Sequence, residues 1–252
     1  MTVKFSYREE KQIKMNSMDT FASRLLRFNR RLADVQLDLP KDYTIINPYR
    51  KLFDEYGVKN MTSFYEKYYN DNYKRMMILG SSPARRRSAV SGVPFLDASL
   101  LKEVVYGNAE SQYLNAFPSD FFYTIIMKFG GWKSFFSTFY MNFVCPLGIV
   151  RTKSDGRVVN ANYYEKKELC ESMRPFLIKS LREQMGLGID ASICYCIGCG
   201  ENYRFLLDVN NQYGFFNTII PLEHPRFIMQ YNSKDRDFYE KKYLSALKNQ
   251  EI

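Results

Sequence analysis

The hydrophobic and polar positions of the chain fall into blocks that predict separate helices and strands. Between residues 21 and 32, apolar residues recur at intervals of three or four, which predicts an amphipathic N-terminal helix. Prolines at positions 40 and 48 interrupt the pattern that follows, so we expect an extended, looping connection over residues 36–60. A helix rich in tyrosine is predicted over residues 61–69.

From residue 75 onward, predicted strands alternate with predicted helices. Short apolar runs predict strands at residues 75–80, within 140–150, at 191–197 and at 217–222. The helices between and after them are expected at 118–136, with a break at the pair of glycines 130 and 131, at 169–181, after residue 200 and at 235–248.

This alternation implies a parallel sheet that is covered by helices on both faces. We therefore predict an α/β fold, a three-layer sandwich around a central, mostly parallel four-stranded sheet. Residues 61–252 would form this domain. Residues 1–60 would be a helical and extended elaboration packed on its core.

Polar residues gather where the predicted strands end, and ligands of open parallel sheets collect at the carboxyl ends of the strands. The first strand runs into Gly80-Ser-Ser-Pro-Ala84. Gly80 permits a sharp turn off the strand, and Ser81 and Ser82 place small polar groups at its mouth. This turn is a candidate binding site.

A basic run follows the turn. Arg85, Arg86 and Arg87 are suited to meet phosphate groups, and Gly92-Val-Pro-Phe95 then presents one aromatic ring. Taken alone, the same segment also fits an ordinary loop with a solvated basic run.

The last predicted strand ends in Glu223-His-Pro-Arg226, and His224 is the only histidine of the chain. A lone histidine is more often structural than catalytic. Its position at the carboxyl end of a buried strand favours catalysis about as strongly as packing, so both interpretations stay open.

The order of these motifs resembles that of the single-strand-selective monofunctional uracil-DNA glycosylases and their bacterial relatives. The motifs are GSSPA at residues 80–84, GVPF at 92–95, CPL at 145–147 and HPR at 224–226, within residues 75–247. In that family the first motif reads GMNPG or GINPG, GVPF or GIPF follows, and a His-Pro loop comes last. The resemblance implies a uracil-DNA glycosylase-like fold and a monofunctional glycosylase. Such an enzyme flips uracil or another deaminated base out of DNA and hydrolyses its N-glycosidic bond in base excision repair.

The resemblance also implies roles for single residues. Phe95 matches the phenylalanine that stacks on the extruded base, and Gly80 and Ser81 belong to the same base-binding pocket. His224 matches the histidine that stabilises negative charge on the departing base, as an oxyanion hole does.

The loop after the histidine departs from the family's HPSPRNP. Pro225, Arg226 and Phe227 fall where the family inserts a wedge into the duplex. Together with the basic run, they form the predicted DNA-binding set.

Two further departures concern catalysis and base recognition. The family asparagine that positions the attacking water aligns with Ser82, and Asp97 is the nearest carboxylate that could supply a base. The family's base-reading asparagine aligns with Phe143, while Asn142 lies one residue earlier. Because strand residues alternate faces, Asn142 would need a bulge to reach the base.

The composition agrees with a nucleic-acid partner but does not identify which one. The net charge is +9, with 20 Tyr and 20 Phe, which suits phosphates and stacked bases but equally a basic protein with an aromatic core. We expect single- or double-stranded DNA with a damaged base as the partner, and a monomer. No apolar run approaches the ~18 residues of a membrane span, so no membrane partner is expected.

The five cysteines are Cys145, Cys170, Cys194, Cys196 and Cys199. An odd number without a secretory signal favours reduced thiols and a cytoplasmic, intracellular location. Cys194 and Cys196 fall on one face of a strand, which favours core packing over a zinc or iron–sulfur site. No metal and no cofactor are therefore expected.

Three functions remain open at this point. The first is an active glycosylase. The second is a weak or inactive protein of the same fold that binds DNA or modified bases, suggested by Ser82. The third is another α/β hydrolase of nucleotides, which lacks support because no Walker-type loop or dinucleotide glycine fingerprint is present.

Overall fold

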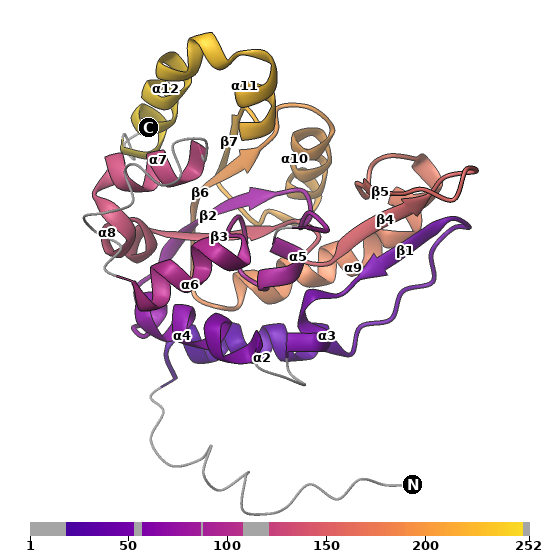
Figure 1. Cartoon of the computed structure of the whole chain (residues 1–252), viewed down its shortest axis with the longest axis horizontal. Helices are drawn as coiled ribbons and strands as arrows, with labels where there is room; N and C mark the ends of the chain where they lie inside the picture. Colours follow the sequence, from indigo (N-terminus) through magenta and orange to yellow (C-terminus); the bar gives the residue numbers. More distant parts are fainter. Residues whose placement is uncertain (1–18, 53–56, 87, 108–120, 249–252) are drawn as a thin grey trace, which may run out of the picture.

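The computed structural model describes residues 19–52, 57–86, 88–107 and 121–248 of the chain. Four parallel strands form its central sheet in the order β3-β2-β6-β7 (Figure 1). They are β3 (Phe139–Phe143), β2 (Arg75–Gly80), β6 (Ile189–Ile197) and β7 (Thr218–Leu222). Every residue of β2 and β3 is buried, as expected for strands covered on both faces. The predicted four-stranded sheet is confirmed.

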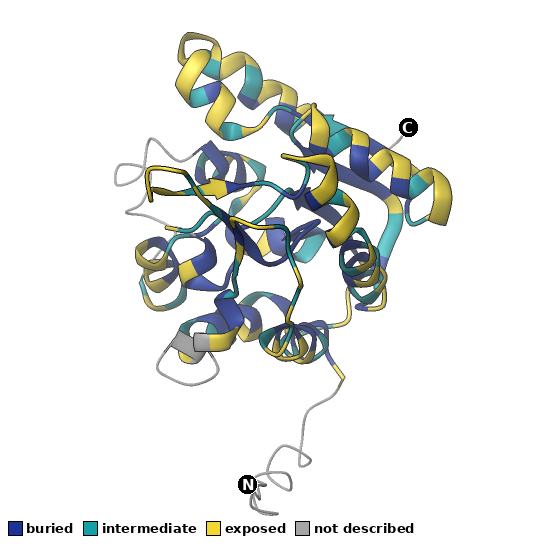
Figure 2. Ribbon diagram, turned by 90° about the vertical axis from the view of Figure 1, so that its right-hand side faces the viewer, coloured by how far each residue is buried: buried dark blue, intermediate teal, exposed yellow. Residues whose placement is uncertain are grey.

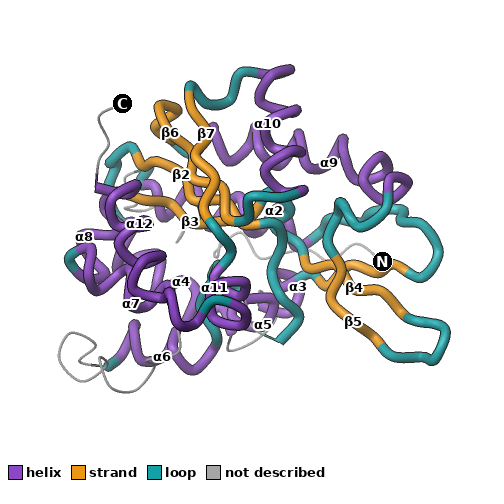
Figure 3. The backbone as a smooth tube through the Cα atoms, turned by 90° about the horizontal axis from the view of Figure 1, so that it is seen from above, coloured by secondary structure: helices purple, strands orange, loops and turns teal. Residues whose placement is uncertain are grey.

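Helices cover both faces of this sheet (Figure 3). On one side lie α9 (Lys167–Met185) and α10 (Glu201–Tyr213). On the other side lie α7 (Phe121–Phe129), α8 (Gly131–Thr138) and α12 (Arg236–Lys248). The helices turn exposed faces outward while strands β2 and β3 are buried (Figure 2). The predicted three-layer α/β arrangement is confirmed.

The break between α7 and α8 falls at the predicted glycine pair. Gly130 and Gly131 have φ angles of 134° and 83°, a region that residues with side chains rarely adopt. Four shorter helical elements are α5 (Ser88–Ser91), α6 (Ala98–Tyr106), α11 (Pro225–Tyr231) and the 3-10 helix η2 (Ser233–Asp235). None of the helices in the described ranges is both long and apolar enough to cross a bilayer.

The N-terminal segment packs on the core through α2 (Phe21–Ala33), which lies against α4 (Gly57–Tyr69). Phe21, Leu25 and Phe28 are fully buried along one face of α2, as the spacing predicts. Thr20 caps the start of this helix: its hydroxyl accepts a hydrogen bond from Ser23 N at 3.3 Å. The short helix α3 (Pro48–Leu52) follows.

A second sheet differs from the sequence-based expectation. It consists of β1 (Tyr43–Ile46), β4 (Gly148–Thr152) and β5 (Val158–Ala161), which pair antiparallel and project from one side of the domain (Figure 1). We expected a looping connection around β1 and a single strand within residues 140–150. The residues that link β3 to β4, numbers 144–147, carry no charged or amide side chain, so no polar position marked the end of β3 and the start of β4.

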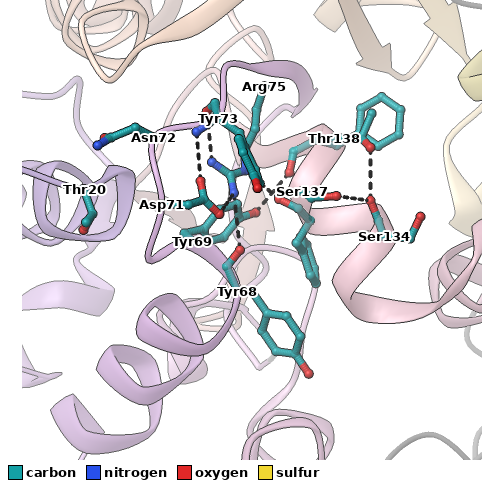
Figure 4. A network of polar contacts seen from close by, with 12 residues as sticks. Thr20, Tyr68, Tyr69, Asp71, Asn72, Tyr73, Arg75, Ser134, Ser137 and Thr138 are labelled. Atoms are coloured by element: carbon teal, nitrogen blue, oxygen red, sulfur yellow. Dashed lines mark hydrogen bonds and ion pairs between the residues drawn. The ribbon is translucent and has the colours of Figure 1, made fainter.

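A buried arginine, Arg75, connects the amino end of β2 to the neighbouring helices (Figure 4). Arg75 is 0% exposed and forms an ion pair with Asp71 at 2.7 Å. Its guanidinium lies 4.9 Å from the ring centre of Phe21 and 4.8 Å from that of Tyr69. It also donates to the carbonyl oxygens of Phe136, Tyr73 and Tyr68. The guanidinium thus links α2, α4, α8 and the sheet.

Candidate active site

An aromatic cavity of about 420 Å³ opens at the carboxyl edge of the central sheet. The turn after β2, the end of β3 and the start of α11 meet there, as the rule for parallel sheets predicts. Six residues predicted for the site line it: Ser82, Phe95, Phe143, His224, Pro225 and Arg226. The other lining residues are Ala84, Ser88, Phe121, Phe122 and Met229.

Gly80, the last residue of β2, lies too close to two aromatic rings to carry a side chain. A Cβ at this position would stand 2.7 Å from Cζ of Phe95 and 2.9 Å from Cδ1 of Phe143. These two rings stack with centroids 4.8 Å apart and planes inclined by 29°. The glycine therefore lets the rings meet above the strand end and form one wall of the cavity.

Phe95 has a strained backbone. Its φ of 63° lies in the left-handed region, which is unusual for a bulky residue. The amide of Phe95 donates to the buried hydroxyl of Ser88 at 3.0 Å, and its ring also packs on Phe122 with centroids 4.8 Å apart. Such conformations cost about 1–3 kcal/mol and concentrate at functional sites. In this backbone conformation, the ring of Phe95 lines the cavity.

His224 caps α11 with its imidazole ring. Arg226 N donates to Nδ1 of His224 at 3.0 Å. Because Nδ1 accepts this bond, the proton of the neutral ring lies on Nε2, which remains a hydrogen-bond donor. Desolvation of the ring in the site and the charge of Arg226 lower the pKa of His224 from its ordinary value of 6.5, although part of the residue stays open to solvent. The histidine is thus neutral at neutral pH.

A second, more polar cavity of about 400 Å³ adjoins the first. Ser82, Ala84, His224 and Arg226 line both cavities and so mark their boundary. Amide and phenol groups supply much of the remaining wall, from Asn160, Asn162, Tyr164, Gln230 and Tyr231.

Asn162 contacts the turn after β2 from the wall of the polar cavity. Its Oδ1 accepts a hydrogen bond from Ser81 Oγ at 3.1 Å and lies 3.5 Å from Ser82 Oγ. Asn162 directly follows β5 and is half-buried. Sequence reasoning missed it, because the segment around β5 carries no motif and the contact spans about eighty residues.

A family model described as the uracil DNA glycosylase superfamily matches residues 66–248. The chain belongs to this superfamily. No curated protein matches the chain. Among solved structures, it is similar to the crystal structure of wild-type SMUG2 from Pedobacter heparinus, with 40% sequence identity and a TM-score of 0.81. The match covers 92% of this chain and 98% of that chain.

Membership in the uracil DNA glycosylase superfamily confirms the resemblance of the ordered motifs. It gives the protein a uracil-DNA glycosylase-type function, with DNA as its partner. How this superfamily member would bind and release a base depends on the residues at the two cavities.

Strand β3 turns Phe143, and not Asn142, toward the aromatic cavity. Asn142 is only 1% exposed, and its Nδ2 bonds the hydroxyl of Tyr140 while its Oδ1 accepts from Phe143 N at 2.8 Å. The register between β2 and β3 is regular up to Gly80 opposite Phe143, so no bulge turns the asparagine around. This strand therefore offers the cavity a ring and not an amide.

Asp97 has a structural task at the start of α6. Its Oδ1 accepts hydrogen bonds from Ser99 N at 3.1 Å and from Leu100 N at 2.9 Å, as an N-cap does. Asp97 lines neither cavity, whereas Ser82 lines both. Neither cavity is lined by an Asp or Glu of the described chain.

Two of the predicted phosphate-binding arginines, Arg85 and Arg86, line neither cavity. Arg85 N donates to Asn160 Oδ1 at 3.1 Å, which joins the basic run to the polar cavity wall. Arg86 is exposed, and Arg87 lies outside the described residues.

The predicted wedge residues form the first turn of α11. Pro225 and Arg226 line the aromatic cavity, and Phe227 lines the polar cavity with 45% of its surface exposed. Arg226 Nε donates to Gln230 Oε1 at 3.2 Å. Thus the helix presents a cation and an exposed ring beside the site.

Cys194 and Cys196 are buried in β6 and pack in the core, as their spacing predicts. Burial raises the pKa of the Cys196 thiol to about 12, so the thiol is protonated at neutral pH. Across the described ranges, no three His, Cys, Asp or Glu residues cluster so that they could hold a metal ion.

Proposed function

We propose that this protein is a monofunctional DNA glycosylase. It receives a uracil or another deaminated base, flipped out of DNA, in the aromatic cavity and hydrolyses its N-glycosidic bond in base excision repair. One observation carries the proposal: aromatic rings for the base, the Ser82 hydroxyl and a neutral histidine donor all line a single cavity. An enzyme that excises a base must hold the flipped base by stacking, and a donor can stabilise the charge that develops on it.

In this proposal, the extruded base packs against the rings of Phe95 and Phe143. The C1′–N bond breaks with its electron pair moving onto the base. Nε2–H of His224 donates to the negative charge that develops there. Within a partly desolvated site this hydrogen bond is stronger than in water, and it acts mainly in the transition state.

The basic residues beside the cavities would hold the sugar–phosphate backbone. Arg85, Arg86 and Arg226 are the described members of this set, and the chain carries a net charge of +9. Phosphate contacts position the nucleic acid without reading its sequence. Phe227, exposed beside Arg226, would contact the bases next to the gap that flipping leaves.

Cleavage of a uracil-containing oligonucleotide tests the proposal. Purified protein is incubated with labelled single- and double-stranded DNA that contains one uracil, and hot alkali then breaks the strand at abasic sites. We expect alkali-dependent breaks at the uracil and intact strands without alkali, since a monofunctional enzyme leaves the backbone uncut. The same assay with hypoxanthine and xanthine covers other deaminated bases. No abasic site with any of these bases contradicts the proposal.

A second candidate function is a protein that binds DNA or a modified base without cutting. The absence of a carboxylate from the described walls of both cavities favours it, because such a group would be the ordinary base for water. It predicts saturable binding of uracil-containing DNA with no abasic product in the same samples.

A further inference from the structure

The arrangement of the two cavities suggests where the attacking water is held. If the base occupies the aromatic cavity, as the proposed function requires, its sugar lies at the boundary formed by Ser82 and His224. Water must approach C1′ from the side opposite the departing base. That side is the polar cavity, which is open to solvent and lined by amides and hydroxyls.

We infer that Asn162 is a catalytic residue that holds the attacking water in the polar cavity, in partnership with Ser82. The inference rests on the proposed function and names a residue that sequence reasoning missed. Asn162 comes from the loop after β5, far along the chain from the turn that it contacts.

The hydrogen bonds of Asn162 fit this role. An amide oxygen has two lone pairs. The bond from Ser81 Oγ at 3.1 Å uses one of them and fixes the amide. The distance from Ser82 Oγ to Asn162 Oδ1 is longer, at 3.5 Å. A hydrogen bond from a hydroxyl to an oxygen is usually about 2.7–2.8 Å long. The second lone pair is therefore available to a water that also contacts Ser82.

The chemistry needs a positioned water more than a strong base. Glycosidic bond hydrolysis passes through an oxocarbenium-like transition state, in which C1′ is already electron-poor when water arrives. The water oxygen forms the bond to C1′ while the C1′–N bond breaks, and the base keeps that electron pair. The water then loses a proton to solvent in the open polar cavity, and the released base takes up one proton. One water is added overall, and the neutral amide of Asn162 gains and loses nothing.

A purely structural role for Asn162 makes different predictions. In that case the amide only ties the loop after β5 to Ser81, so its loss would lower stability and disturb DNA binding. Glu165 provides a matched control in the same loop. Its backbone amide donates to the carbonyl of Asn162 at 3.0 Å, its side chain pairs with Arg151 at 3.0 Å, and it lines neither cavity.

The test compares wild type, Asn162→Ala and Glu165→Ala in single-turnover cleavage of single-stranded uracil DNA. For Asn162→Ala we expect a rate about 100-fold lower, the effect of losing a positioned reactant. Oligonucleotide affinity and melting temperature should match those of wild type. Glu165→Ala should cleave at the wild-type rate.

A water–methanol mixture adds a readout that a structural role would not change. The two nucleophiles give an abasic sugar or its methyl glycoside. In Asn162→Ala, the methyl glycoside fraction should rise, because the amide no longer selects water. A wild-type rate in Asn162→Ala would overturn this inference but leave the proposed function standing. A slower rate with a lower melting temperature and an unchanged product ratio would do the same. A wild-type protein that leaves no abasic site overturns the proposed function as well.

Discussion

The two ends of strand β2 show how one short strand serves stability at its start and chemistry at its finish. At the amino end, the guanidinium of Arg75 is buried and donates hydrogen bonds to Asp71 and to three carbonyl oxygens. At the carboxyl end, Gly80 carries no side chain, Phe95 is strained and His224 retains a donor beside a cavity. A buried polar group with complete hydrogen bonds indicates structure, whereas strain and spare donors in a cavity indicate function.

The largest expected effect concerns the enclosed end. Arg75→Met would leave Asp71 and the carbonyl oxygens without their donor, so we expect the free energy of unfolding to fall by about 3–5 kcal/mol. Urea unfolding measures the change. Lys74→Ala, at the exposed neighbour, is the control and should stay within about 0.5 kcal/mol of wild type. If Arg75→Met lowered the cleavage rate per folded molecule without loss of stability, the contrast between the two ends would fail.

At the site end, His224→Ala should lower the single-turnover rate by about 10²–10³, or roughly 2.7–4 kcal/mol, because one charge-stabilising donor is lost. His224→Ala should lower this rate more than Ser82→Ala does. His224→Ser separates the two roles of the residue, since serine still caps a helix but cannot replace the imidazole donor. A folded His224→Ser variant with wild-type activity would make His224 a cap only.

Phe95 tests whether strain and activity are linked. Phe95→Ala should weaken transition-state stabilisation by roughly 1–3 kcal/mol, the size of a base-stacking contact. Phe95→Gly should lose the same activity but be more stable than Phe95→Ala by about 1 kcal/mol, since glycine adopts the positive φ without strain. Single-turnover kinetics and urea unfolding measure both quantities. Equal stability of the two variants would argue against backbone strain at this site.

The site end should also depend on pH, through His224. Because the pKa of His224 is lowered in the folded protein, its neutral form persists below pH 6.5 and the rate should be flat above that value. At lower pH, protonation of Nδ1 removes the acceptor of Arg226 N, so the ring loses the hydrogen bond that orients Nε2–H and the rate should fall. Stability has the same sign: the unfolded chain binds the proton more readily, so the contribution of His224 is lost as the pH falls below 6.5. If a His224→Ser variant lost as much stability at acid pH as wild type does, that loss would come from groups other than His224.

The smallest expected effect is on DNA binding. Arg86→Ala should reduce the slope of log affinity against log salt by about 0.7–0.9, the contribution of one phosphate contact. Lys74→Ala, at the other end of β2, should leave the slope unchanged. Fluorescence anisotropy across a salt series measures both. Identical slopes for the two variants would remove Arg86 from the DNA contacts.

Much of the fold was predictable from the sequence because strands and helices follow from local patterns. The run from Arg75 to Gly80 is apolar enough to indicate a buried parallel strand, and the structure places β2 over those residues. The glycine pair at 130 and 131 marked the break between α7 and α8, since both positions need positive φ. Where the signal was not local, prediction failed: β4 was merged with β3 because the buried stretch between them lacks a polar residue.

At the site, the sequence by itself determined which residue types end each strand, namely the serines after Gly80, the ring of Phe95 and the single histidine. Only the tertiary structure decided which of them meet. Strand register turned Phe143 into the cavity and Asn142 away from it, the start of α6 engaged Asp97, and the second sheet brought Asn162 to Ser81. The reason is physical: periodicity reports a residue's own strand or helix, whereas a contact across eighty residues depends on how separate elements pack.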